Sequence, residues 1–218
     1  MQKKNNLIYK LLNTSFIFYC LEKVLEKILT YYWTALFKLK CLFFGIKVGK
    51  RIEIFGNCIT RKYPFSNIQI GNHVQLISSS WRSSTANCHK CKLRTFSSSA
   101  SIIFEDNSGM TGGVVVARSK QIRIGKNCMI APNVVITDSD WHNVWPPKKR
   151  KELLSHDADA GVTLEENVWI GMNVLILKGV TIGQNCVIAA GSVVTKSIPQ
   201  NCLAGGNPAK VIKQYVGM

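Results

Sequence analysis

The residues best suited to chemistry lie in one short stretch, Thr137-Asp138-Ser139-Asp140-Trp141-His142-Asn143. An imidazole titrates near neutral pH, so His142 could take a proton from a hydroxyl group as that oxygen attacks an electrophile. Asp138 or Asp140 could orient the ring and stabilise its protonated form, although only one carboxylate can do so directly. A polar loop without a catalytic role would look the same, so the surrounding pattern must decide.

The chain on both sides of this stretch repeats every six residues after Gly45. One column holds aliphatic residues: Leu164, Ile170, Ile176, Ile182, Ile188 and Val194. A second column, four positions later in each unit, holds small or β-branched residues: Val168, Val174, Val180, Cys186 and Ser192. A fixed period of six, with inward side chains and a turn in each unit, predicts a parallel β-solenoid over residues 46–215.

Loops inserted into this repeat are where we expect binding and catalysis. Residues 77–100 are rich in Ser, Thr and basic side chains, which predicts a first loop. Residues 138–160 form a second break, and a short C-terminal extension begins near Ser197. His142 therefore lies where a strand ends and the second loop begins, which favours the catalytic interpretation.

Residues 1–45 have a different period, and we expect them to form a basic amphipathic helical segment. Apolar residues recur at steps of three and four: Leu21, Leu25, Ile28, Tyr32, Leu36 and Leu39. Lysines flank this face, as in helices that lie in a bilayer interface. Packing on the protein's own domain or on another subunit explains the stripe equally well. The charge-free runs are too short for a membrane span, and no cleavage site follows Leu21.

The composition limits the partners and the compartment. The formal net charge of +16 favours anionic partners, but no recognition helix or aromatic stacking motif accompanies the lysines, so we do not expect nucleic-acid binding. The eight cysteines are scattered, which favours a reduced, cytoplasmic protein. Cys88 and Cys91 have CxxC spacing without a second ligand pair, which favours a surface loop, and we expect no metal.

The solenoid sequence resembles the hexapeptide-repeat acyltransferases, and bacterial sugar and polysaccharide O-acetyltransferases in particular. The likeness is tightest over ENVWIGMNVLILKGVTIGQNCVIAAGSVVTKSIPQNCLAGGNPAKVIK, and it covers about residues 46 to 215. It implies a left-handed parallel β-helix, a homotrimer, acetyl-CoA as the acetyl donor and a catalytic histidine at the position of His142. The six-residue period alone implies neither the handedness nor the trimer.

The same resemblance implies roles for further residues. In those enzymes the backbone N–H of the tryptophan in the WIG motif, here Trp169, is associated with the oxyanion, and its ring with the donor or acceptor site. The coenzyme A contacts carried over are Met172, Ala190, Thr195, Lys196, Lys210 and Lys213. The family often has Ser at the position of Met172 and Arg at those of Lys210 and Lys213, so bidentate recognition of phosphate would be lost while the charge attraction remains.

The sequence therefore predicts an acetyl-CoA-dependent O-acetyltransferase with His142 as the general base. The expected acceptor is a hydroxyl of a bacterial surface polysaccharide or of its lipid-linked precursor, and the enzyme would be cytoplasmic, with peripheral membrane contact left open. We expect Trp141 and Trp145 to contact the acceptor, although Trp141 could instead brace the loop. Serine, aminosugar and antibiotic acetyltransferases on the same fold, and a non-catalytic solenoid scaffold, are the alternatives.

Overall fold

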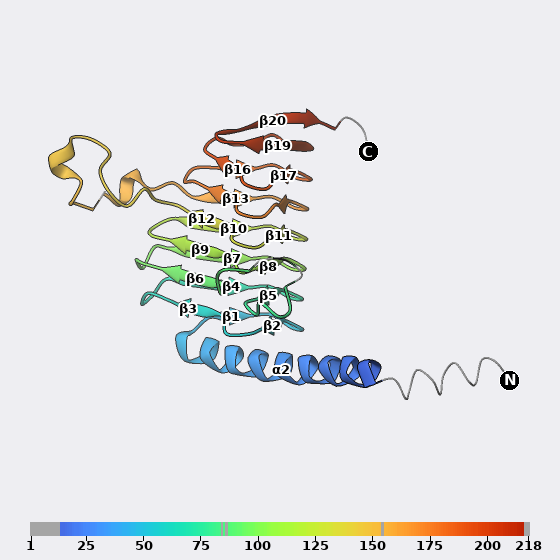
Figure 1. Cartoon of the computed structure of the whole chain (residues 1–218). Coiled ribbons are helices and arrows are strands. Elements are labelled where there is room, and N and C mark those ends of the chain that lie inside the picture. Colours follow the sequence, from blue (N-terminus) through green and yellow to red (C-terminus); the bar gives the residue numbers. More distant parts are fainter. Residues whose placement is uncertain (1–13, 84, 86, 154, 216–218) are drawn as a thin grey trace.

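The computed structural model describes residues 14–83, 85, 87–153 and 155–215. Its strands wind into three parallel sheets, and each strand pairs with the strand one coil later (Figure 1). Trp169, for example, pairs with Val187 of the next coil. The predicted left-handed β-helix with an N-terminal helix is confirmed.

Each sheet takes every third strand of the solenoid. The first sheet contains β1 (Lys47–Val48), β4 (Asn67–Ile70), β7 (Ser101–Phe104), β10 (Gln121–Ile124), β13 (Val162–Leu164) and β16 (Thr181–Ile182). The second contains β2 (Glu53–Phe55), β5 (Gln75–Ile77), β8 (Gly109–Thr111), β11 (Met129–Ile130), β14 (Trp169–Ile170), β17 (Val187–Ile188), β19 (Cys202–Gly206) and the antiparallel β20 (Ala209–Gln214). The third contains β3 (Ile59–Arg61), β6 (Lys92–Thr95), β9 (Val114–Ala117), β12 (Val135–Thr137), β15 (Leu175–Ile176) and β18 (Val193–Val194).

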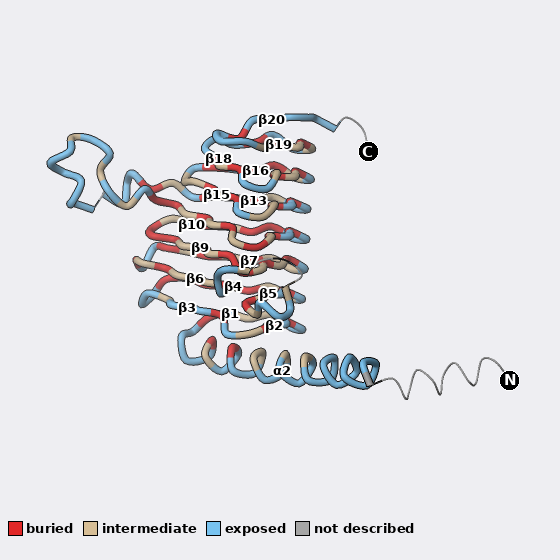
Figure 2. The backbone as a smooth tube through the Cα atoms, in the orientation of Figure 1, coloured by how far each residue is buried: buried red, intermediate tan, exposed pale blue. Residues whose placement is uncertain are grey.

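The core is the narrow interior between the three sheets. Both columns found in the sequence are buried there, from Leu164 to Val194 and from Val168 to Ser192 (Figure 2). Coils stack so closely that a Cβ at Gly171 would come within 2.6 Å of the Ala190 backbone nitrogen, which explains the glycine. The six-residue period of the sequence therefore correctly predicts which side chains point inward.

The first predicted loop is shorter than expected, because residues 92–100 belong to the solenoid. Strand β6 lies inside the predicted range 77–100, and it pairs with β3 and β9. Leu93 and Thr95 point inward while Lys92 and Arg94 point outward, so the strand has few apolar residues although it is regular. The loop itself covers residues 78–91, and the second loop extends between β12 and β13 as predicted.

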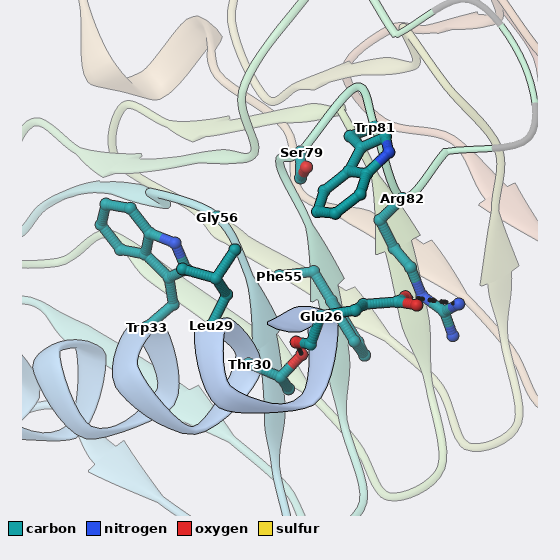
Figure 3. A pocket seen from close by; sticks show the side chains of 9 residues that line it. All are labelled: Glu26, Leu29, Thr30, Trp33, Phe55, Gly56, Ser79, Trp81 and Arg82. Atoms are coloured by element: carbon teal, nitrogen blue, oxygen red, sulfur yellow. Dashed lines mark hydrogen bonds and ion pairs between the residues drawn. The ribbon is translucent and has the colours of Figure 1, made fainter. Parts of the chain in front are cut away.

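Helix α2 (Thr14–Phe44) lies across the β1–β2 end of the stack (Figure 1). Phe37 and Cys41 are buried against the solenoid, and the Thr34 hydroxyl accepts the backbone N–H of Ile54 at 3.0 Å. That N–H is a ladder donor at the end of the sheet, where no further coil could accept it. Figure 3 shows a second anchor, in which Arg82 of the first loop reaches Glu26 of α2 at 2.7 Å. No helix in the described part of the chain is long and apolar enough to cross a membrane.

Candidate active site

The second loop leaves the third sheet after β12 and projects sideways from the stack (Figure 1). Its described residues include two short 3₁₀ turns, Pro147–Lys149 and His156–Ala158. His142 is exposed near the start of the loop and forms an isolated antiparallel bridge with Leu153. This bridge closes the outer part of the loop into a hairpin, with His142 at its base.

Asp138 fixes the first stem of this loop through the backbone of the neighbouring coil. Its carboxylate is fully buried and accepts three backbone N–H groups, from Arg118 at 2.7 Å, Ser119 at 3.0 Å and Lys120 at 2.7 Å. Hydrogen bonds from N–H groups to a carboxylate are stronger than those between neutral groups. Asp138 is thus committed to holding the stem and does not contact the imidazole.

Asp159 fixes the second stem against the same turn. The Arg118 guanidinium donates to both carboxylate oxygens, at 3.1 and 3.2 Å, and the Ser119 hydroxyl donates at 2.5 Å. Burial raises the pKa of Asp159, but the hydrogen bonds from Ser119, Ser139 and Arg118 and the Arg118 charge outweigh it and lower the pKa overall. The carboxylate is therefore held in its ionised form.

Asp140 is on the exposed side of the loop and pairs with Lys178, with 2.7 Å between Nζ and the carboxylate. Its backbone carbonyl oxygen accepts the His142 N–H at 2.8 Å. Lys178 also donates to the Ala158 carbonyl oxygen at 2.9 Å, so it connects both stems. Within the described part of the chain, the His142 imidazole has no hydrogen-bond partner, and neither predicted aspartate orients it.

The two predicted acceptor tryptophans differ in their surroundings. The ring of Trp141 packs edge-to-face on Phe96 at a centroid distance of 4.7 Å, and Arg94 covers the same phenyl ring at 4.0 Å. Trp141 thus braces the loop against the third sheet while remaining partly accessible. Trp145 is largely exposed near the loop tip, so its indole is open to a ligand.

Trp169 lies on the second sheet, on a different face of the solenoid from the loop that carries His142. Its backbone N–H donates to the Cys186 carbonyl oxygen at 2.9 Å as part of the coil-to-coil ladder. This N–H is therefore engaged within the solenoid, and its binding of an oxyanion stays a prediction. The indole ring is half exposed and is what Trp169 offers to a ligand.

The predicted coenzyme A contacts lie in the coils beyond β14 and in β20. Met172 and Ala190 belong to successive coils, where the Gly191 N–H donates to the Met172 carbonyl oxygen at 2.8 Å. Lys210 and Lys213 are exposed on β20, and the Lys213 ammonium lies 4.9 Å from the Tyr215 ring centroid. Thr195 and Lys196 follow β18 and are exposed. These residues share one end of the stack and expose positive charge there.

Cys88 and Cys91 do not converge on a common site. Cys88 is exposed, whereas the Cys91 thiol is buried and donates to the carbonyl oxygens of Ile77 and Met110 at 3.3 and 3.4 Å. Burial raises the pKa of Cys91 and that of Cys128, the latter to about 11, so both remain thiols and pack as small core residues. Among the described residues, no group of three His, Cys, Asp or Glu side chains could hold a metal.

Sequence reasoning missed Arg118, Ser119, Asp159 and Lys178, which hold the loop. Asp159 lies inside the predicted loop, but no motif next to it in the sequence indicated a role. Arg118 and Asp159 are 41 residues apart, and they meet only because adjacent coils stack. The predicted first loop was too long and hid strand β6, so the coils could not be counted correctly from the sequence. A correct count would have placed Arg118 one coil before the loop that carries His142.

The solenoid is similar to known proteins in both sequence and structure. Residues 161–196 match the family model described as bacterial transferase hexapeptide (six repeats). The crystal structure of a maltose O-acetyltransferase from Clostridium difficile 630 is 31% identical, with a TM-score of 0.50, and the match covers 77% of this chain and 68% of that one.

Two curated relatives extend the comparison. Galactoside O-acetyltransferase of Escherichia coli strain K12 is 44% identical over 93 residues, which are 43% of this chain and 44% of the relative. Polysialic acid O-acetyltransferase of Escherichia coli O1:K1 / APEC is 39% identical over 105 residues, which are 48% of this chain and 33% of the relative. The chain spans about half the length of the first curated relatives that it matches.

Proposed function

Because this chain belongs to the hexapeptide-repeat acyltransferases, we propose that it transfers an acetyl group from acetyl-CoA to a carbohydrate hydroxyl. The observation that carries the proposal is the His142 imidazole, which is exposed, without a hydrogen-bond partner among the described residues, and attached to a loop clamped at both stems. A general base must be held in a fixed position, and its imidazole must be free to accept a proton from the substrate.

The reaction follows from this arrangement. His142 takes the proton of the acceptor hydroxyl as its oxygen bonds to the thioester carbonyl carbon. The carbon–sulfur bond then breaks, the acetyl group stays on the acceptor oxygen, and the imidazolium returns its proton to the departing thiolate. Asp140 lies two residues from His142, and its carboxylate pairs with Lys178.

The acetyl donor fits the residues at the C-terminal end of the stack. Lys196, Lys210 and Lys213 are exposed cations suited to the coenzyme phosphates. Met172 and Ala190 lie in stacked coils, so the pantetheine arm could run along that face past the exposed ring of Trp169. Bound there, acetyl-CoA would supply the activated acetyl group.

Trp169 lies on a different face of the chain from His142, whereas Thr195 and Lys196 follow β18 of the same sheet that carries the His142 loop. We propose that a second copy brings the Trp169 face of one chain to the His142 loop of another. A homotrimer, as the sequence predicts, would place the loop of one copy against the second sheet of its neighbour. Because the proposed site uses residues of two copies, the homotrimer is part of the proposal.

We propose a surface polysaccharide or its lipid-linked precursor as the acceptor, with the enzyme in the cytoplasm. The named relatives act on a galactoside, maltose or polysialic acid, which supports a carbohydrate hydroxyl. All eight cysteines are free, consistent with a reducing compartment.

The test is acetyl-CoA-dependent thiol release by the purified chain, measured with oligosaccharides, serine, aminosugars and antibiotics as acceptors. We expect turnover with an oligosaccharide, and a loss of about 100-fold or more in His142→Ala. His156→Ala, on the same loop, is the matched control and should keep its activity. Turnover confined to an amino acceptor would contradict O-transfer. Full activity of a folded His142→Ala protein would refute the assigned base, and no turnover with any acceptor would indicate a non-catalytic scaffold.

A further inference from the structure

The apolar stripe of α2 points away from the protein that carries it. The six residues that define the helical period, Leu21, Leu25, Ile28, Tyr32, Leu36 and Leu39, are 39% to 58% exposed. The solenoid instead packs on a different side of the helix, through Phe37, Cys41 and the Thr34 hydroxyl. Packing on the same chain, one of the two explanations that the sequence left open, therefore does not account for the stripe.

The exposed stripe is long and forms an end surface of the molecule. Helix α2 has 31 residues, which at about 1.5 Å per residue gives a length of about 46 Å. It crosses the first coil, so its outer side faces directly away from the stack (Figures 1 and 2). Solvent-exposed apolar surfaces of this extent mark sites of association.

Positive charge runs along one edge of the stripe. A groove of about 700 Å³ lies between α2 and the first coil, and its charged lining residues are five basic ones and two acidic ones: Lys23, Lys27, Lys38, Arg51, Arg82, Glu26 and Glu53. Glu26 is paired with Lys23 and with Arg82, and Figure 3 shows the pair with Arg82. The other acid of the groove, Glu53, accepts a hydrogen bond from Gln75 at 2.7 Å. Lys3, Lys4 and Lys10 precede the helix in the sequence. An apolar face bordered by lysines matches the layering of a bilayer surface, with acyl chains beside anionic headgroups.

We propose that the outer side of α2 binds an anionic phospholipid bilayer, with the helix axis in the interface plane. A second copy of the chain fits less well, because the outer side of its own α2 would supply apolar contact but no negative charge for the lysines. A bilayer instead supplies apolar contact and negative charge at once. The proposal does not depend on catalysis.

The test is sedimentation of the full chain with vesicles made of equal parts of phosphatidylcholine and phosphatidylglycerol. We expect wild-type protein to bind these vesicles, to bind phosphatidylcholine vesicles more weakly, and to dissociate as salt rises. The triple variant Leu21→Gln, Ile28→Gln, Leu39→Gln should lose about 100-fold or more in vesicle affinity. The matched control is Val211→Gln, Ile212→Gln, Tyr215→Gln, which changes exposed residues at the opposite end of the stack and should bind like wild type.

A second variant keeps the test decisive if the triple variant folds poorly. Lys27→Gln with Lys38→Gln leaves the apolar stripe intact and should weaken binding about 30-fold, with a smaller salt dependence. Unchanged vesicle binding by both variants overturns the proposal. It is also overturned if wild-type protein ignores vesicles but forms a larger oligomer that the triple variant cannot form, since the occupant would then be a second copy.

Discussion

At the scale of residues, two buried carboxylates hold the loop that carries His142, and each uses a different partner. Asp138 binds backbone N–H groups of residues 118–120, whereas Asp159 binds the side chains of Arg118 and Ser119. Both contacts anchor the loop to the same turn of the preceding coil. The position of His142 therefore depends on residues that need not touch a substrate.

Replacing Asp159 by asparagine should destabilise the protein in a pH-dependent way. The Arg118–Asp159 pair is almost fully buried, so loss of the negative charge leaves the guanidinium poorly compensated, at a cost of about 3 kcal/mol at neutral pH. The pKa of Asp159 is lowered in the folded protein, so its stabilising effect is present above the unfolded value near 4 and is lost as pH falls through the folded value. Urea unfolding of both proteins from neutral to acidic pH measures this.

The matched control for this prediction is Asp157→Asn on the same loop. Asp157 is exposed and bonds only locally with Ser155, so its replacement should change the unfolding free energy by less than about 0.5 kcal/mol. An Asp159→Asn protein as stable as wild type at neutral pH, or a deficit that persists unchanged in acid, would contradict the assigned role.

At the scale of elements, the strands could be predicted because two side chains in each six-residue unit point inward. That rule gave both buried columns, from Leu164 to Val194 and from Val168 to Ser192. The rule did not identify β6, because its inward-pointing residues, Leu93 and Thr95, alternate with the basic residues Lys92 and Arg94 and the strand has little apolar pattern. The sequence also could not separate Asp138 from Asp140, because burial against residues 118–120 depends on how two coils stack. Local pattern thus predicts the coils but not the contacts between them.

Helix α2 should stabilise the solenoid by closing its first coil. Thr34→Val keeps the side-chain volume but removes the acceptor for the Ile54 N–H, which costs about 1 to 2 kcal/mol if the donor stays buried. Thr30→Val is the matched control, because the Thr30 hydroxyl bonds only to Glu26 of the same helix, at 2.8 Å. Thermal unfolding should show the larger loss for Thr34→Val. Equal effects of the two changes would show that α2 does not cap the sheet through this hydrogen bond.

At the scale of the whole molecule, the positions of α2 and the His142 loop set a distance between the membrane and the chemistry. In the third sheet, β12 lies three strands above β3, which at about 4.8 Å per strand gives about 14 Å. The helix below adds its own diameter of about 10 Å. With the outer side of α2 on the bilayer, the base of the loop would stand about 25 Å from that side of the helix.

This separation predicts a dependence on acceptor length that combines both proposals. In vesicles, a lipid-linked glycan long enough to span about 25 Å should be acetylated, whereas one with a single sugar next to the lipid should react poorly because it cannot reach His142. The same two glycans released into detergent should react at similar rates, because the membrane no longer fixes their position. Acetyl transfer to each, followed by mass spectrometry, measures the difference. Equal rates for the short and long glycans in vesicles would exclude this orientation, because an enzyme held by the outer side of α2 keeps its reactive loop at a fixed height.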